Sequence, residues 1–211
     1  WKKKQEKKKK KGEPYDSVMA IKPLDVQVSV SSQLDPDKNI IFSFPTPLAK
    51  ADTAGIHLYA KHDTLWYKAP LEFLPLGNRK YELRGEWRPD IEYSLEVDSA
   101  AFEDIYGLAS KPIKQGFKVN SLDTYGTLLV NITSLSDQPL LVQLLDAQDK
   151  MVKEVKTSNG VAEFYYLKPE KYYMRLIVDR NNNGKWDTGN YDTDLQPEEV
   201  YYYPEAIECK A

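Results

Sequence analysis

The chain has 211 residues, 41% of them hydrophobic and 12% aromatic, which is the composition of a folded protein with room for two modest domains. Its net charge is −3, but residues 2–11 carry eight lysines and one glutamate, or +7, which leaves −10 for the remainder. This acidic remainder argues against nucleic acid as a partner, because phosphate binding needs Lys and Arg concentrated on the folded surface. The sequence contains no run of about eighteen apolar residues, which is the length needed to span a membrane as a helix. Its one cysteine, Cys209, has no internal disulfide partner.

Residues 1–13 form a basic, low-complexity segment. Like charges repel, and the segment has no apolar face to bury, so it is typical of a solvated linker or a frayed helix end. Attraction to an anionic lipid surface or to nucleic acid is the functional alternative. The breaker Glu13-Pro14 closes the lysine run and favours the linker.

Residues 14–120 have the pattern of short β-strands. Asp25–Val30 alternates apolar and polar residues with period two, and Ile56–Ala60 and Thr64–Tyr67 predict a hairpin. About seven such strands, separated by Pro or Gly turns, predict a sandwich of two sheets. The other predicted strands are Asn39–Phe44, Arg79–Arg84, Glu92–Val97 and Gln115–Val119.

This region resembles the bacterial Ig-like domains that occur in tandem on surface proteins, over residues 24–119. The resemblance lies in a strand followed by a proline loop, a Pro-x-x-x-Tyr lead into a later strand, and an Asp/Gly turn before the last strand. The segments that carry it are Ile40–Pro45, Gly55–Leu58, Trp87–Leu95, Phe102–Gly107 and Phe117.

Residues 121–211 contain a second series of strands, after a linker at Ser121–Thr124. The step from Phe164 through Leu167 and Pro169 to Tyr172 resembles the transthyretin-like (carboxypeptidase-regulatory-like) sandwich domains, although Glu170-Lys171 stands where many relatives have Gly. The predicted fold is therefore all-β, with two tandem β-sandwich domains, Ig-like and then transthyretin-like. The strands predicted here are Gly126–Ile132, Leu140–Leu145, Met151–Val155, Gly160–Leu167, Tyr172–Val178 and Glu199–Tyr203.

The segment after the predicted strand Tyr172–Val178 has the spacing of an oxygen-ligand calcium loop. Positions 1, 3, 5 and 9 of such a loop would be Asp179, Asn181, Asn183 and Asp187, with Gly184 at position 6. The backbone carbonyl of Lys185 would be the position-7 ligand. These five ligand residues form the predicted metal site, with calcium as the possible ion.

The same loop has a weakness as a calcium site, and it has a second interpretation. Position 12 is Asn190, which cannot act as a bidentate carboxylate, so Asp192, Asp194 or Glu198 would have to fold back. Alternatively the segment is a hairpin loop without metal, in which Asn and Asp bond their own main chain and Gly184 adopts a positive φ. Both interpretations stay open at this point.

The sequence does not predict an enzyme, and we assign no catalytic residue. His57 and His62 are the only imidazoles, and neither adjoins a nucleophile motif. Nucleotide-binding, zinc and Gly-x-Ser-x-Gly patterns are missing. Paired acids such as Asp192 and Asp194 lie in a polar stretch where nothing apolar would raise a pKa.

Seven tyrosines of the second domain form a second candidate site. They could make an exposed platform for glycan or protein, although alternation places Phe164 and Tyr166 on one face and Tyr165 on the other, so about half should be core. The tyrosines are Tyr165, Tyr166, Tyr172, Tyr173, Tyr201, Tyr202 and Tyr203.

The lysine-rich segment, the Ig-like pattern and the motif from Asp179 to Tyr191 together resemble the C-terminal part of a Bacteroidota family of Ig-like-domain-containing surface lipoproteins. The resemblance implies an outer-membrane lipoprotein of the cell envelope, with an N-terminal lipid anchor and a further Ig-like domain outside this chain. We therefore expect a non-enzymatic structural or interaction module whose partner is an unknown protein or glycan at the cell surface. The alternative is a calcium-stabilised glycan-binding or adhesive module.

Overall fold

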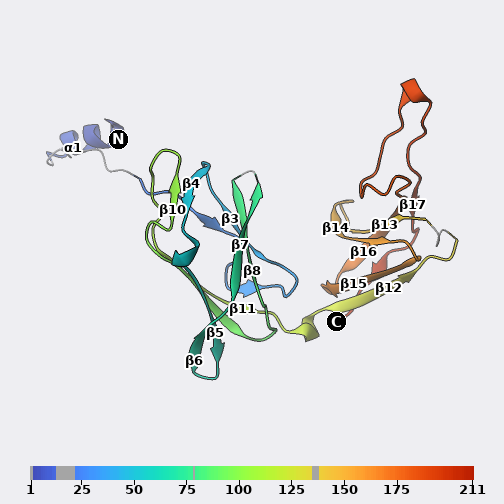
Figure 1. Ribbon diagram of the computed structural model, residues 1–211, viewed down its shortest axis with the longest axis horizontal. Helices are drawn as coiled ribbons and strands as arrows, with labels where there is room; N and C mark the ends of the chain where they lie inside the picture. The colour runs from blue at the N-terminus through green and yellow to red at the C-terminus, as the bar shows by residue number, and fades with distance from the viewer. Residues whose placement is uncertain (1, 13–21, 78, 135–137) are drawn as a thin grey trace. The chain divides into compact units, whose positions relative to one another are not determined.

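A computed structural model describes residues 2–12, 22–77, 79–134 and 138–211 of the chain. These residues divide into two compact units (Figure 1). The first contains the part of the chain up to Leu34 together with Lys38–Val119, and the second contains Asp35–Asp37 with Asn120–Ala211. The start of the Ig-like domain at residue 14, and the Glu13-Pro14 breaker, lie outside the described residues.

The first unit is a sandwich of two sheets around one core. One sheet has the order β1-β3-β8-β7 and the other has the order β2-β11-β9-β5-β6, while β10 and β4 form a small extra ribbon. Phe42, Leu58, Leu83 and Leu95, which come from both sheets, are fully buried between them. The strands are β1 (Gln27–Val28), β2 (Gln33–Leu34), β3 (Ile40–Ser43), β4 (Leu48–Ala51), β5 (Ile56–His62), β6 (Leu65–Lys68), β7 (Leu71–Gly77), β8 (Lys80–Gly85), β9 (Glu92–Val97), β10 (Phe102–Asp104) and β11 (Ile113–Val119), with a short 3-10 turn η1 (Thr53–Gly55) before β5.

The strand order of this unit is that of an Ig-like sandwich. The first sheet corresponds to strands A-B-E-D and the second to G-F-C with an added C′ strand. Tyr93, at the start of β9, forms the tyrosine corner of such folds. Its hydroxyl donates to the Glu86 carbonyl at 2.8 Å and accepts from the Arg88 amide at 3.0 Å, which fixes the turn before β9.

The second unit packs a two-stranded sheet, β12-β15, against a sheet of order β14-β13-β16-β17, with β18 also pairing β16. Val142 and Leu144 of one sheet and Phe164 of the other are fully buried between them. The elements are β12 (Gly126–Asn131), β13 (Leu140–Leu145), β14 (Met151–Thr157), β15 (Val161–Leu167), β16 (Lys171–Val178), β17 (Val200–Tyr202) and β18 (Ile207–Glu208), with 3-10 turns η2 (Leu122–Thr124) and η3 (Tyr191–Thr193). The all-β prediction of two sandwich domains is confirmed, whereas the transthyretin likeness of this second unit stays a prediction.

Three features of the elements differ from the sequence predictions. Lys2–Lys10 is an α-helix, α1, because a run of lysines without Gly, Pro or β-branched residues has good intrinsic helix propensity. β7 was not predicted, because Pro75 lies inside its apolar run; β7 is the last strand of its sheet, where proline is tolerated. β4 and β10 are too short and too irregular to show a period.

Tyr166 does not face the core with Phe164, so that part of the tyrosine prediction is wrong. The pairing of β12 with β15 shifts register between Gly126 and Leu128, and Tyr166 has a φ of 55°. An extra residue in one strand breaks the alternation of faces beyond it. As a result Tyr165 and Tyr166 are both exposed, although they are neighbours in one strand.

Candidate functional site

The loop predicted as a calcium site begins at a buried carboxylate. Asp179 directly follows β16 and is 1% exposed. Its Oδ1 accepts the Asn183 amide at 3.0 Å and its Oδ2 accepts the Gly184 amide at 2.7 Å. Gly184 adopts a φ of 77°, which brings the chain back over the carboxylate. Asp179 therefore holds the backbone of its own loop.

The other loop side chains gather on Asp187. The amide nitrogens of Asn181 and Asn183 donate to Asp187 Oδ2 at 2.5 and 2.6 Å. Their amide oxygens accept main-chain N–H groups instead, from Asn183 at 3.1 Å and from Lys185 at 2.8 Å. The structure thus brings Asp179, Asn181, Asn183 and Asp187 into one hydrogen-bonded loop.

Glu198 closes this loop from its far end. The side chain folds back and is 7% exposed, and its two oxygens accept the Arg180 amide at 2.8 Å and the Asp187 amide at 3.0 Å. Its carbonyl accepts Trp186 Nε1 at 3.0 Å, and its own amide donates to the Asp187 carbonyl at 3.1 Å. Glu198 therefore clamps residues 180 and 187 together.

The loop has the oxygens for a weak cation site but not in a binding arrangement. Calcium takes six to eight oxygen ligands, and here the two asparagines present nitrogen to Asp187. Coordination would require both amides to reverse and to release their main-chain donors. Among the described residues, no three His, Cys, Asp or Glu side chains form a metal-type cluster. The calcium site stays a prediction.

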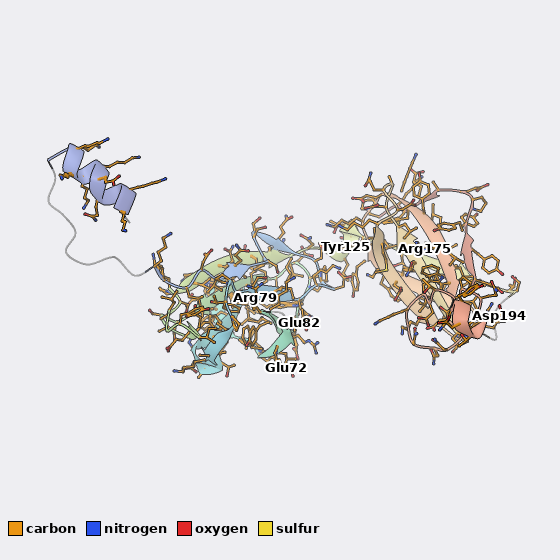
Figure 2. The ribbon with its side chains drawn as sticks, turned by 90° about the horizontal axis from the view of Figure 1, so that it is seen from above. Glu72, Arg79, Glu82, Tyr125, Arg175 and Asp194 are labelled. Atoms are coloured by element: carbon orange, nitrogen blue, oxygen red, sulfur yellow. The ribbon has the colours of Figure 1, made fainter. Side chains whose placement is uncertain are left out.

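Of the three acids that could fold back on the loop, only Glu198 does so. Asp192 and Asp194 lie in the part of the β16–β17 connection that projects from the sheets with η3 at its tip (Figure 1). Figure 2 shows Asp194 away from Arg175, which lies in the sheet of the same unit. The projection is closed by the pairing of Asn190 with Leu195, and Tyr191 at its tip is fully exposed.

A second candidate site, the tyrosine cleft, lies along the edge strand β17. It is a cavity of about 170 Å³ lined by Tyr201, Tyr202 and Tyr203 together with the apolar residues Ile132, Val142, Met174 and Leu176. In the ladder Tyr201 lies opposite Leu176, whereas Tyr202 lies opposite Arg175 and directs its hydroxyl to the other face of the sheet. The three rings are 48%, 61% and 46% exposed. Tyr172, by contrast, is buried, and its hydroxyl donates to the Lys168 carbonyl at 2.9 Å.

Charged groups border the tyrosine cleft on the strand β17 side. Glu199 accepts the Tyr201 hydroxyl at 2.8 Å and pairs with Arg180 at 2.9 Å, and these donors hold the pKa of the Glu199 carboxyl below its usual value. The same carboxylate raises the pKa of Tyr201. On the other face of the sheet a hydrogen-bonded ladder crosses four strands, from Glu154 through Gln143 and Arg175 to Tyr202.

The first unit contains a buried aspartate, Asp104, that holds the backbone of its own loop, as Asp179 does in the second unit. Asp104 is 1% exposed; its Oδ1 accepts the Tyr106 amide at 2.9 Å and the Leu108 amide at 2.8 Å. Its Oδ2 accepts the Thr46 hydroxyl at 2.7 Å. Gly107 in this loop has a φ of 76°. Sequence reasoning marked this segment only as an Asp/Gly turn.

The two histidines are rim residues of β5. His57 Nε2 lies 3.3 Å from Asp98, and His62 Nδ1 lies 3.4 Å from Asp63, with the His62 side chain largely exposed. The described part of the chain has no helix that is both long and apolar enough to cross a membrane.

No family model and no curated protein matches the chain. Similar solved structures include the N-terminal part of the bacterial S-layer protein SbsC, with a TM-score of 0.42, 11% identity, and cover of 75% of this chain and 41% of that one. A two-domain fibronectin type III segment from chicken tenascin has a TM-score of 0.26 and 13% identity, covering 88% of this chain and 98% of that one. The Bacillus anthracis TIE protein has a TM-score of 0.25 and 15% identity, covering 90% of this chain and 32% of that one. Similarity at this level says nothing about activity or partners.

Proposed function

We propose that this chain is a non-enzymatic interaction module of a bacterial cell-surface lipoprotein. The observation that carries the proposal is the tyrosine cleft, because half-exposed aromatic rings beside an apolar surface are suited to contact with a sugar face or a partner side chain. The sequence resemblance to surface lipoproteins supports the cell envelope as its location.

Binding to a glycan array tests the tyrosine cleft. We expect the labelled chain to bind glycans and the double variant Tyr201→Ala/Tyr203→Ala to lose about tenfold or more in affinity, because two stacking rings are removed. Tyr165→Ala is the matched control, since Tyr165 is 49% exposed on the other sheet of the same unit. Equal loss in the control, or none in the double variant, would exclude the cleft as the binding surface.

A calcium-stabilised adhesive module is the second candidate. It is favoured by the gathering of Asp179, Asn181, Asn183 and Asp187 in one loop. With two carboxylates the expected dissociation constant is on the order of 0.1 mM, so about 1 mM calcium would stabilise the second unit by roughly 1.4 kcal/mol.

Thermal unfolding with and without calcium tests this candidate. We expect about 1 mM calcium to raise the melting midpoint of the second unit by roughly 6 °C. Asp187→Asn should abolish the shift while keeping an acceptor for the two asparagine amides. If several mM calcium moves neither midpoint, the loop is a structural hairpin without metal.

A further inference from the structure

The strand β6 ends one sheet of the first unit with a largely apolar edge, in which Lys68 is the one charged residue. In the sheet order β2-β11-β9-β5-β6, β6 pairs with β5 and with no other strand among the described residues. Its residues Leu65, Trp66 and Tyr67 are 60%, 48% and 54% exposed. Figure 1 shows the β5–β6 hairpin extending from the body of its unit. Natural proteins usually protect such an edge, because it is a template for a further strand.

The register of the hairpin shows which backbone groups of β6 point outward. Tyr59 pairs with Lys68 and Ala60 with Tyr67, and the Ala69 amide donates to the Leu58 carbonyl at 2.8 Å. In an antiparallel ladder, residues exchange hydrogen bonds at every second position. The N–H and C=O groups of Tyr67 therefore face β5, and those of Trp66 and Lys68 face away from it.

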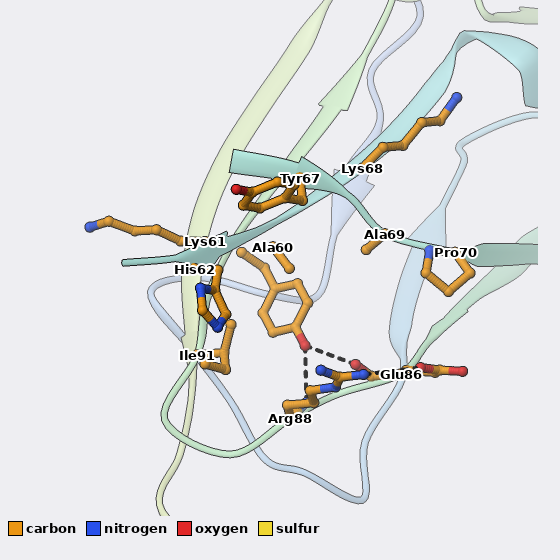
Figure 3. A pocket seen from close by; sticks show the side chains of 11 residues that line it. Ala60, Lys61, His62, Tyr67, Lys68, Ala69, Pro70, Glu86, Arg88 and Ile91 are labelled. Atoms are coloured by element: carbon orange, nitrogen blue, oxygen red, sulfur yellow. Dashed lines mark hydrogen bonds and ion pairs between the residues drawn. The ribbon is translucent and has the colours of Figure 1, made fainter. Parts of the chain in front are cut away.

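A cavity of about 370 Å³ opens beside this edge (Figure 3). Ala60, Ala69, Pro70 and Ile91 line it, together with the corner residue Tyr93 and the exposed ring of Tyr67. In Figure 3 the ammonium groups of Lys61 and Lys68 point away from the cavity. The cavity is therefore mainly apolar on the face of the sheet on which Leu65, Tyr67 and Ala69 project, and His62, Glu86 and Arg88 also line it.

We propose that β6 pairs antiparallel with β6 of a second copy of this chain, with Tyr67 on the two-fold axis. In this register Trp66 lies opposite Lys68 of the second copy, and Lys68 lies opposite its Trp66. The outward N–H and C=O groups of both residues are then paired in closed rings, and the two sheets become one continuous sheet.

The side chains of β6 are complementary to themselves in this register. Trp66 already has the Lys61 ammonium of its own chain 5.9 Å from its ring centre, and in this register the Lys68 ammonium of the second copy adds a cation–π contact to the same ring. In the directly opposed pairs no lysine faces a lysine. The two Tyr67 rings meet across the axis. Leu65 of the second copy lies opposite Ala69, at the open side of the apolar cavity. A shift by one residue would turn every one of these side chains to the wrong face.

Cysteine cross-linking of the full chain tests the register. Residues on the axis of a non-hydrogen-bonded pair have Cα atoms about 4.5 Å apart, within the range of a disulfide. Tyr67→Cys should therefore form a disulfide dimer under mild oxidation. Leu65→Cys should not, because the two copies of residue 65 lie about 13 Å apart along the strands, although Leu65 is equally exposed. Adding Ala69→Cys to Leu65→Cys should restore the cross-link.

Sedimentation equilibrium tests the same interface without a covalent bond. We expect the wild-type chain to dimerise with concentration, and Lys68→Pro to weaken the dimer about 30-fold relative to Lys68→Ala, because proline removes one outward donor from each copy. The β5–β6 ladder does not use that donor, so the hairpin itself is preserved. A wild-type chain that stays monomeric at high concentration, or equal cross-linking of Tyr67→Cys and Leu65→Cys, would overturn the proposal.

Discussion

Asp104 in the first unit and Asp179 in the second both hold the backbone of the loop that follows them, although the two loops differ in length. Each is 1% exposed, accepts two main-chain amides of the loop that follows it, and is accompanied by a glycine at a φ near 76°. In the Asp104 loop the carboxylate accepts one further hydrogen bond, from the Thr46 hydroxyl. The Asp179 loop is longer and needs Glu198 as a second clamp. A motif spaced like a calcium loop can thus be held by hydrogen bonds from its own backbone and side-chain amides.

The largest effect is expected from removing the second clamp. Glu198→Ala should lower the free energy of unfolding of the second unit by about 3 kcal/mol, because the Arg180 and Asp187 amides lose a charged acceptor. Hydrogen exchange of β16 peptides in urea would measure this for the second unit alone. Glu205→Ala, at an exposed position, should change it by less than about 0.5 kcal/mol. Equal effects of the two variants would show that Glu198 does not stabilise the second unit.

The two aspartates can be compared directly. Without calcium, Asp104→Ala and Asp179→Ala should each lower the melting midpoint of their own unit by roughly 5–10 °C, because each leaves two amides without an acceptor. Hydrogen exchange read on β9 and on β16 assigns each loss to its unit. If Asp104→Ala is tolerated and Asp179→Ala is not, the two buried carboxylates do not stabilise their loops in the same way, which would contradict this prediction.

A smaller effect is expected at the two glycines. Gly107→Ala and Gly184→Ala should each cost about 1 kcal/mol, because alanine is strained at a positive φ. The added methyl group of Gly184→Ala would meet the Lys156 ammonium, but this is the far end of a flexible side chain that can move aside. Gly184→Ala should therefore cost no more than Gly107→Ala in a urea titration, and adding Lys156→Ala should not change its cost. A lower cost in the double variant would contradict this.

The smallest expected effect is the loss of stability of the first unit at low pH. Burial raises the pKa of Asp104, but the donors Thr46, Leu108 and Tyr106 outweigh it and hold the pKa below the ordinary value of 3.8. A carboxyl with a lowered folded pKa contributes stability above 3.8 and loses it as the pH falls through the folded value. The first unit should therefore lose stability below about pH 4. The urea midpoints of the wild type and Asp104→Asn, measured from pH 6 to 2.5, should become more similar as the pH falls. A difference between the two midpoints that stays constant with pH would contradict this.

Much of the fold could be predicted because most strands are regular. Leu140–Leu145 and Glu92–Val97 were predicted with the bounds that β13 and β9 have, since their apolar patterns end at clear turn residues. The alternation rule failed at Tyr166, where a register shift reverses the face of the chain. No residue pattern in the sequence around Tyr166 indicates that register shift.

The candidate site could be predicted only in part. The spacing from Asp179 to Asp187 correctly identified side chains that meet, because local hydrogen bonds between Asx residues follow from sequence separation. The clamp by Glu198 depends on β17 returning beside β16, which is a tertiary event. The edge of β6 and its cavity depend likewise on which strand ends the sheet.

The closure between Asp187 and Glu198 has a consequence for how this chain can vary. The Glu198 amide bonds the Asp187 carbonyl, so residues 188–197 begin and end at one fixed point. Insertions, deletions or a grafted peptide between those two positions would leave the clamp and both sheets untouched. The projecting segment is thus the place where related chains can differ in length, and where a tag or epitope could be displayed without loss of the fold.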